Sequence, residues 1–173
     1  MKQSTLIILL IALSISACVS SKNKGVVGMK RTDKPIVVEQ TYKVERQTVW
    51  KAITKPEELK QWLFNTIEEF EPRVGFETLF VVEVEGVKYP HRWKVTQADD
   101  NKKIQYSWKY DGFSGAAIVT FELSEEAESK TRLQLTYRAV EDFSHEENFT
   151  RKVAEEGWTF LIQESLKKYL EKE

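Results

Sequence analysis

Five consecutive segments between residues 76 and 139 alternate apolar and polar side chains along their length. Because side chains of a strand point to opposite faces in turn, such alternation predicts strands with one buried face. Turn sequences separate the segments, including Glu85-Gly86 and Asp111-Gly112, and short turns between successive strands produce antiparallel hairpins. The pattern therefore predicts an antiparallel sheet that is covered on one side.

The segment before this run is predicted to supply a further strand and two short helices. Residues 36–44 are rich in β-branched side chains, which favours a first strand. Residues 48–53 place apolar side chains at helical spacing, and a second helix is predicted from Pro56 to about Phe64. The sequence Thr54-Lys-Pro-Glu57 forms a capping box for that second helix.

The C-terminal segment is predicted to form the long helix that covers the sheet. The residues Ser144 to Glu147 form a second capping box, which predicts the start of this helix. An apolar stripe then recurs at three- and four-residue spacing. Its members are Trp158, Leu161, Ile162, Ser165, Leu166, Tyr169 and Leu170.

This order of elements resembles the START-like (SRPBCC) helix-grip fold. Residues 48–62, TVWKAITKPEELKQW, are similar to the first helix pair of that family, and residues 157–172, GWTFLIQESLKKYLEK, are similar to its terminal Gly-Trp helix. Together they resemble the branch named for homology to the activator of Hsp90 ATPase. The resemblance covers about residues 36–172. It implies an α+β, Bet v 1-like fold, in which a curved antiparallel sheet of about seven strands wraps around the C-terminal helix.

The N-terminus has the composition of an export signal. Lys2 provides a positive charge, and residues 6–15 form an apolar stretch about half as long as a membrane-spanning helix requires. The end of this stretch, Ile15-Ser-Ala-Cys18, resembles a bacterial lipobox, in which the signal is cleaved before the cysteine and the cysteine is acylated. We therefore expect a lipoprotein signal peptide over residues 1–17, a lipidated flexible tether over 18–35, and a START-like domain over 36–173.

Acylation of Cys18 would anchor the protein in a membrane of the bacterial cell envelope, because two or three acyl chains bind a membrane almost irreversibly. The domain would face the periplasm or the cell surface. Val19 does not match the aspartate of the inner-membrane retention signal, so we expect the outer membrane if the organism is Gram-negative. An exported chain is not expected to meet cytosolic Hsp90, and we expect a monomer.

Charge and composition exclude several classes of function. The 26 Lys and Arg residues against 27 Asp and Glu give a net charge of −1, whereas nucleic-acid binders normally carry a clear basic excess. One cysteine and two histidines leave little material for a metal site, and we expect no metal or other cofactor. The sequence has no nucleophile elbow, phosphate-binding loop or dinucleotide fingerprint, so we expect no enzyme.

Function in this fold family usually lies in the cavity between the sheet and the long helix. The residues predicted to line it are Tyr89, His91, Trp93, Tyr106, Trp108, Tyr110, Phe121 and Trp158. Aromatic walls with polar tips suit a small hydrophobic or aromatic ligand or a lipid. A carrier of this kind should hold a cavity of about 300 Å³ or more.

Other interpretations of the same residues remain open. The aromatic residues can simply pack the core, and the domain can be a protein-interaction module with a filled core and an exposed apolar patch. A third alternative is a cyclase or hydrolase with His91 as the acid–base group. The adjacent residues Ser144-His145-Glu146 form no catalytic triad, because neighbours on one helical turn point in different directions.

Overall fold

Six antiparallel strands form one sheet in the computed structural model, which describes residues 25–127 and 129–171. The strands are β1 (Ile36–Tyr42), β2 (Glu77–Val84), β3 (Val87–Asp99), β4 (Lys103–Tyr110), β5 (Ala116–Ala127) and β6 (Lys130–Glu141). The helices are α1 (Arg46–Thr54), α2 (Pro56–Trp62), the short η1 (Glu147–Phe149), α3 (Arg151–Phe160), η2 (Leu161–Ser165) and α4 (Leu166–Glu171). The α+β helix-grip prediction is confirmed, with six strands in place of about seven.

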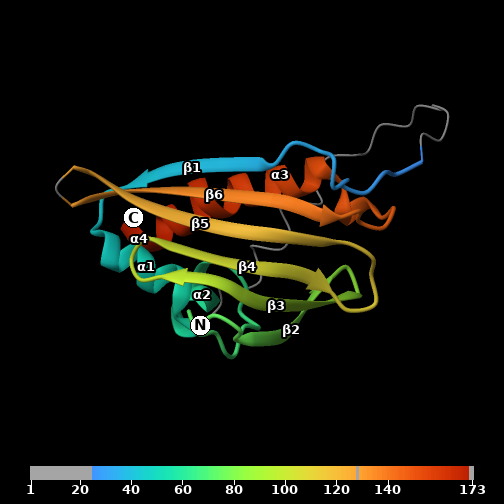
Figure 1. Cartoon of the computed structure of the whole chain (residues 1–173), viewed down its shortest axis with the longest axis horizontal. Coiled ribbons are helices and arrows are strands. Elements are labelled where there is room, and N and C mark those ends of the chain that lie inside the picture. Colours follow the sequence, from blue (N-terminus) through green and yellow to red (C-terminus); the bar gives the residue numbers. More distant parts are fainter. Residues whose placement is uncertain (1–24, 128, 172–173) are drawn as a thin grey trace.

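The strand order across the sheet is β1-β6-β5-β4-β3-β2, so β1 and β2 are the two edges (Figure 1). The predicted turn at Glu85-Gly86 is confirmed as a two-residue hairpin, with φ of 51° and 81° at the two positions. Asp111-Gly112 instead belongs to a longer loop, because β4 ends at Tyr110 and β5 begins at Ala116.

The C-terminal helix lies against one face of the sheet, behind β1 and β6 in Figure 1. Along β6, buried Leu133, Leu135 and Tyr137 alternate with more exposed residues, as the sequence pattern predicts. The opposite face is solvated and carries ion pairs between neighbouring strands, such as Lys94 with Glu77. The core therefore lies between the sheet and the helix.

The long helix starts later than its sequence suggests. Ser144 is in a loop, and the N-cap of α3 is Thr150, whose hydroxyl accepts a hydrogen bond from the Val153 N–H at 3.3 Å. The predicted capping box at Ser144 is therefore wrong. The box at Thr54 is wrong as well, because this hydroxyl donates backward to the Trp50 carbonyl at 2.6 Å and the N-cap of α2 is Lys55.

A π-helical segment, η2, interrupts the long helix between α3 and α4. A π turn leaves backbone carbonyls without their usual intrahelical partners. The buried hydroxyl of Tyr42 on β1 donates to the Ile162 carbonyl at 2.8 Å. In addition, Ser165 donates to the Trp62 carbonyl at the end of α2, at 2.7 Å. Hydrogen bonds to β1 and to α2 thus hold the π segment in place.

Part of the predicted tether packs against the domain. Met29 is buried, its N–H donates to the Phe149 carbonyl at 2.7 Å, and its own carbonyl accepts from the Phe143 N–H at 2.9 Å. The Arg31 N–H also donates to the Asp142 carboxylate at 2.9 Å. The segment before β1 is therefore attached to the loop that joins β6 to α3.

The predicted signal peptide and Cys18 lie outside the described residues. Within the described ranges, no helix combines the length and the apolar character needed to cross a membrane.

Candidate functional site

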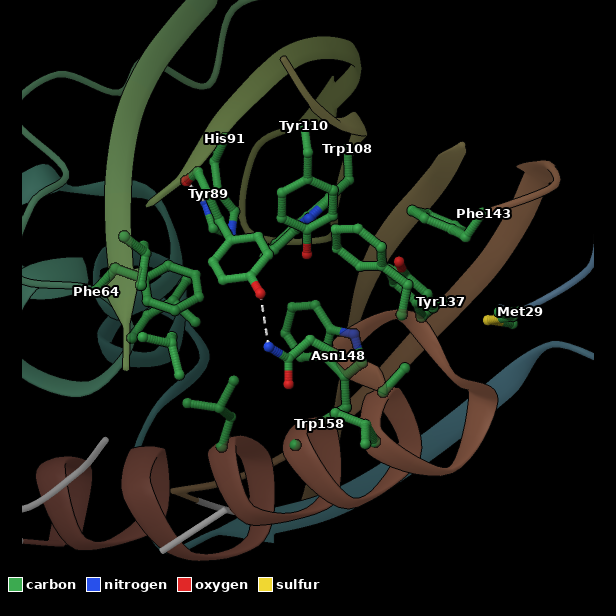
Figure 2. A pocket seen from close by; sticks show the side chains of 18 of the residues that line it. Met29, Phe64, Tyr89, His91, Trp108, Tyr110, Tyr137, Phe143, Asn148 and Trp158 are labelled. Carbon is green, nitrogen blue, oxygen red and sulfur yellow. Dashed lines mark hydrogen bonds between the residues drawn. The ribbon is translucent and has the colours of Figure 1, made fainter. Parts of the chain in front are cut away.

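A cavity of about 230 Å³ lies between the sheet and α3. Strands β2, β3, β4 and β6 form one wall, and η1, α3 and η2 form the other. Figure 2 shows side chains from both walls converging on this space. The strands contribute Val82, Val84, Tyr89, His91, Trp108, Tyr110 and Tyr137; the helical segments contribute Asn148, Phe149, Val153, Ala154, Gly157, Trp158, Phe160 and Leu161; and Met29, Leu63, Phe64 and Phe143 complete the lining.

Five of the eight predicted lining residues lie on the cavity wall. These are Tyr89, His91, Trp108, Tyr110 and Trp158. The other three, Trp93, Tyr106 and Phe121, are buried in the adjoining core and do not line the cavity. Trp93 and Tyr106 stack on each other with ring centroids 4.8 Å apart, and the edge of Phe70 packs against both rings. This part of the core is filled by protein side chains.

His91 sits in a box of aromatic rings. Its ring stacks on Phe80 at 5.0 Å between centroids, and Phe64, Trp108 and Tyr110 surround it at 5.1, 5.2 and 4.6 Å. Burial in these apolar surroundings lowers the pKa of His91 to about 4, because the charged imidazolium loses its hydration there. At neutral pH the imidazole is therefore uncharged.

A hydrogen bond to the Tyr89 carbonyl determines the tautomer of His91. Nδ1 lies 2.8 Å from the carbonyl oxygen of Tyr89, which can only accept, so the proton of the neutral ring is on Nδ1. Nε2 is then an unprotonated acceptor on a side chain that lines the cavity. His91 thus offers the cavity a lone pair and no charge.

Two further polar groups lie beside His91 on the sheet wall. His91 pairs directly with Tyr110 across β3 and β4, and the Tyr110 hydroxyl points into the open space (Figure 2). Burial raises the pKa of the Tyr110 hydroxyl, and the nearby Trp108 indole offsets part of that rise. The Trp108 Nε1–H lies beside that hydroxyl and, like the Trp93 Nε1–H in the filled core, is buried away from the open space. The polar groups that the sheet wall offers to the cavity are therefore Nε2 of His91 and the Tyr110 hydroxyl.

The helical wall is mostly apolar and is tied to the sheet at η1. The Asn148 side-chain amide donates to the Tyr89 hydroxyl at 2.7 Å, which joins η1 to β3 across the cavity (Figure 2). Gly157 on α3 lines the cavity, and a Cβ at this position would meet nothing within 4 Å. The space in front of Gly157 is therefore open.

The cavity is electrically neutral. Among the residues that the structure describes, no Asp, Glu, Lys or Arg lines it. The described ranges also hold no group of three or more His, Cys, Asp or Glu side chains that could bind a metal ion. The other histidine, His145, is exposed in the loop before η1, where Nε2 lies 3.2 Å from the Lys30 ammonium.

Sequence reasoning missed several important residues of the wall. Tyr137 follows the same inward alternation as its neighbours on β6, so this pattern could have identified it. Asn148 and Met29 lie in segments without periodicity, and no local signal places them at the cavity. Phe64 follows α2 and is brought to the cavity by the turn there.

Solved structures with this fold include several bacterial proteins. A protein of Rhizobium loti superimposes with a TM-score of 0.68 at 21% identity, over 79% of this chain and 96% of that chain. A protein of Chromobacterium violaceum gives 0.63 at 20% identity, over 79% and 94%. An Aha1 dimer from Colwellia psychrerythraea, solved in solution, gives 0.58 at 23% identity, over 80% and 97%. At these identities the likeness shows the fold alone.

No curated protein matches the chain at a significant level. The family described as "Activator of Hsp90 ATPase homolog 1-like protein" matches residues 43–171. This range runs from the end of β1 to the end of α4 and therefore contains both short helices, the other five strands and the long helix. Because the match covers most of the chain, the protein belongs to the Activator of Hsp90 ATPase homolog 1-like family.

Proposed function

We propose that the domain binds a small, uncharged, hydrophobic or aromatic ligand in the cavity between the sheet and α3. The observation that carries the proposal is a cavity walled by aromatic side chains that also offers polar groups, Nε2 of His91 and the Tyr110 hydroxyl. Ligand sites are typically apolar pockets with a few polar groups that fix orientation.

The size of the cavity limits the size of the ligand that it can hold. At about 230 Å³ it is smaller than the roughly 300 Å³ at which drug-sized pockets begin. This favours a molecule of one or two rings, or a short part of a longer chain. The alternative of a filled core fits only the neighbouring region around Trp93 and Tyr106.

We propose a binding role without catalysis. His91 is the histidine of the cavity, and burial lowers its pKa to about 4. General acid–base catalysis is most efficient when the pKa of the group lies near the working pH. At neutral pH His91 is a weak base and is almost never protonated, which suits a hydrogen-bond acceptor better than a proton donor.

The protein-interaction alternative has one feature in its favour. Leu79 and Val81 on the edge strand β2 are 51% and 41% exposed and lie on the same side of the strand. An exposed apolar pair on an edge strand is a place where a strand of another chain can pair with the sheet. The first experiment therefore has to distinguish a ligand from a partner.

The first experiment is native mass spectrometry of a truncated chain that begins at Val19, purified from its own host without detergent. The deleted N-terminal segment must end before Gly28, because Met29 is part of the cavity wall. We expect a discrete mass surplus that is lost on denaturation. Gly157→Leu, which fills the open space in front of α3, should lose the surplus, whereas Glu156→Leu on the exposed side of the helix should keep it.

Two results together would contradict the ligand proposal. The wild type would show no mass surplus, and the Gly157→Leu variant would bind every apolar probe as tightly as the wild type does. A mass surplus of protein size would support the interaction alternative.

We further propose that Cys18 is acylated and holds the domain at a membrane of the bacterial cell envelope. The support is the lipobox-like sequence that ends at the only cysteine of the chain. Cys18→Ser should move the protein from the membrane fraction to the soluble fraction. Retention of this variant in the membrane would contradict the proposal.

A further inference from the structure

The polar groups of the cavity are concentrated on its sheet wall. His91 and Tyr110 are paired across β3 and β4, with ring centroids 4.6 Å apart, and Trp108 precedes Tyr110 by two residues on the same face of β4. The facing part of α3 presents Val153, Ala154 and Gly157 to the cavity. A ligand in this space therefore meets hydrogen-bonding groups on one side and apolar groups on the other.

These polar groups differ in what they can do. Nε2 of His91 can only accept, because the proton of the neutral ring is on Nδ1 and is directed to the Tyr89 carbonyl. The Tyr110 hydroxyl can donate or accept. A ligand group that donates to His91 and accepts from Tyr110 must be able to do both. A hydroxyl group does both within the space of a single oxygen atom.

The charge of the surroundings excludes ionised groups. Among the described residues, no acidic or basic side chain faces the cavity, and burying an unpaired ion is costly. A carboxylate would also place its oxygen lone pairs against that of His91. A polar group that is neutral at physiological pH is therefore required.

From this arrangement we infer that the ligand is an uncharged ring compound with a hydroxyl group, of the phenol or cyclic-alcohol class. Its hydroxyl donates to Nε2 of His91 and accepts from the Tyr110 hydroxyl, and its ring lies against the apolar wall of α3. This inference rests on the proposed binding function and adds the chemistry that selects the ligand.

The test compares three probes of almost the same shape: 2-naphthol, 2-methoxynaphthalene and 2-naphthoate. The full chain is placed in lipid nanodiscs, and binding is measured by titration calorimetry. Nanodiscs with the Gly157→Leu variant serve as the reference for partitioning into lipid. We expect 2-naphthol to bind about tenfold more tightly than 2-methoxynaphthalene, since the ether leaves Nε2 of His91 unpaired. The naphthoate anion should bind most weakly.

Variants locate the preference at His91. His91→Phe keeps a ring of similar size in the aromatic box and removes the acceptor, so 2-naphthol and 2-methoxynaphthalene should bind equally. Tyr110→Phe should weaken both by a similar factor, because each probe retains an oxygen that accepts. Tyr106→Phe removes a hydroxyl from the filled part of the core and should change neither affinity.

The outcomes separate the two proposals. Equal binding of 2-naphthol and 2-methoxynaphthalene to the wild type, or tightest binding of the naphthoate, overturns the hydroxyl inference and leaves the ligand-binding proposal standing. A tenfold preference that survives in His91→Phe also overturns it. If no probe binds the wild type better than the Gly157→Leu variant, both proposals fail.

Discussion

Gly28 is the position at which a single methyl group should detach the N-terminal segment from the cavity wall. A Cβ there would lie 2.2 Å from the Ser144 carbonyl oxygen and 2.5 Å from that of Phe143. Both are backbone atoms, so no side-chain rotation relieves the clash. Gly28→Ala must therefore move either this segment or the loop after β6.

The free energy that holds the segment limits the cost of this substitution. Burying Met29 contributes about 2 kcal/mol, and its two backbone hydrogen bonds contribute about 1 kcal/mol each. Fixing the backbone of the four residues from Gly28 to Arg31 costs about 1 kcal/mol per residue. The balance lies within about 2 kcal/mol of zero, so releasing the segment is the cheaper response to the clash.

We predict that Gly28→Ala lowers the free energy of unfolding by no more than about 2 kcal/mol, because only the local packing is lost. In hydrogen exchange, the Met29 and Phe143 amides should exchange freely, while the amides that pair β5 with β6 keep their protection. Gly25→Ala is the matched control, since a Cβ at Gly25 meets nothing within 4 Å. Continued protection of the Met29 amide in Gly28→Ala, or loss of protection throughout the sheet, would refute this reasoning.

Three further predictions concern stability. Thr150→Ala should lower the free energy of unfolding, measured by urea denaturation, by about 1 kcal/mol because it removes the N-cap of α3. Ser144→Ala should lower it by almost nothing. The reverse ranking would support the predicted capping box at Ser144. Tyr42→Phe should lower the free energy of unfolding by about 1–3 kcal/mol, because a buried carbonyl of the π segment loses its donor. Tyr106→Phe should lower it by less than about 0.5 kcal/mol. Equal losses of stability in the two variants would contradict this account. Burial lowers the pKa of His91 to about 4, so below pH 6.5 the unfolded state protonates this histidine and the folded state does not. The free energy of unfolding should therefore fall by about 2–3 kcal/mol between pH 7 and about pH 4.5. The same fall in His91→Phe would show that other groups cause the pH dependence.

The sheet was predictable because alternation carries information about a whole strand. The first of the five alternating segments begins at Phe76, and it forms β2, which begins one residue later at Glu77. The hairpin loops were less predictable. The charged sequence of residues 125–130 favours a loop, yet β5 continues to Ala127 and β6 begins at Lys130, directly paired with it. Beyond the edge of the core both faces of a strand are solvated, so charged residues there do not interrupt pairing.

The start of the long helix was not predictable from local sequence, because a distant segment determines it. Ser144 follows Phe143, whose N–H is bound to the Met29 carbonyl. The Ser144 N–H is itself bound to the Ser114 carbonyl, so both residues are tied to other parts of the domain before η1. The capping pattern at Ser144 is compatible with a helix start, but tertiary hydrogen bonds at its neighbour favour the loop.

The cavity was predictable only in part, for a similar reason. Alternation indicates which side chains face the helix, and it correctly predicted that both His91 and Trp93 face inward. Whether such a side chain meets protein or open space depends on the opposite layer. Trp93 meets Phe70, which comes from the segment between α2 and β2, while His91 lines the same cavity as Gly157, which has no side chain to fill the space.

The π segment between α3 and α4 is equivalent to one extra residue in the long helix. Because the wider turn absorbs this residue, removing one residue from Leu161–Ser165 would restore regular helix without rotating α3 against α4. Trp158 and Gly157 would stay on the cavity wall, and Leu166 and Leu170 would stay buried. The π segment is thus a point at which the length of the long helix can change by one residue without altering which side chains line the cavity.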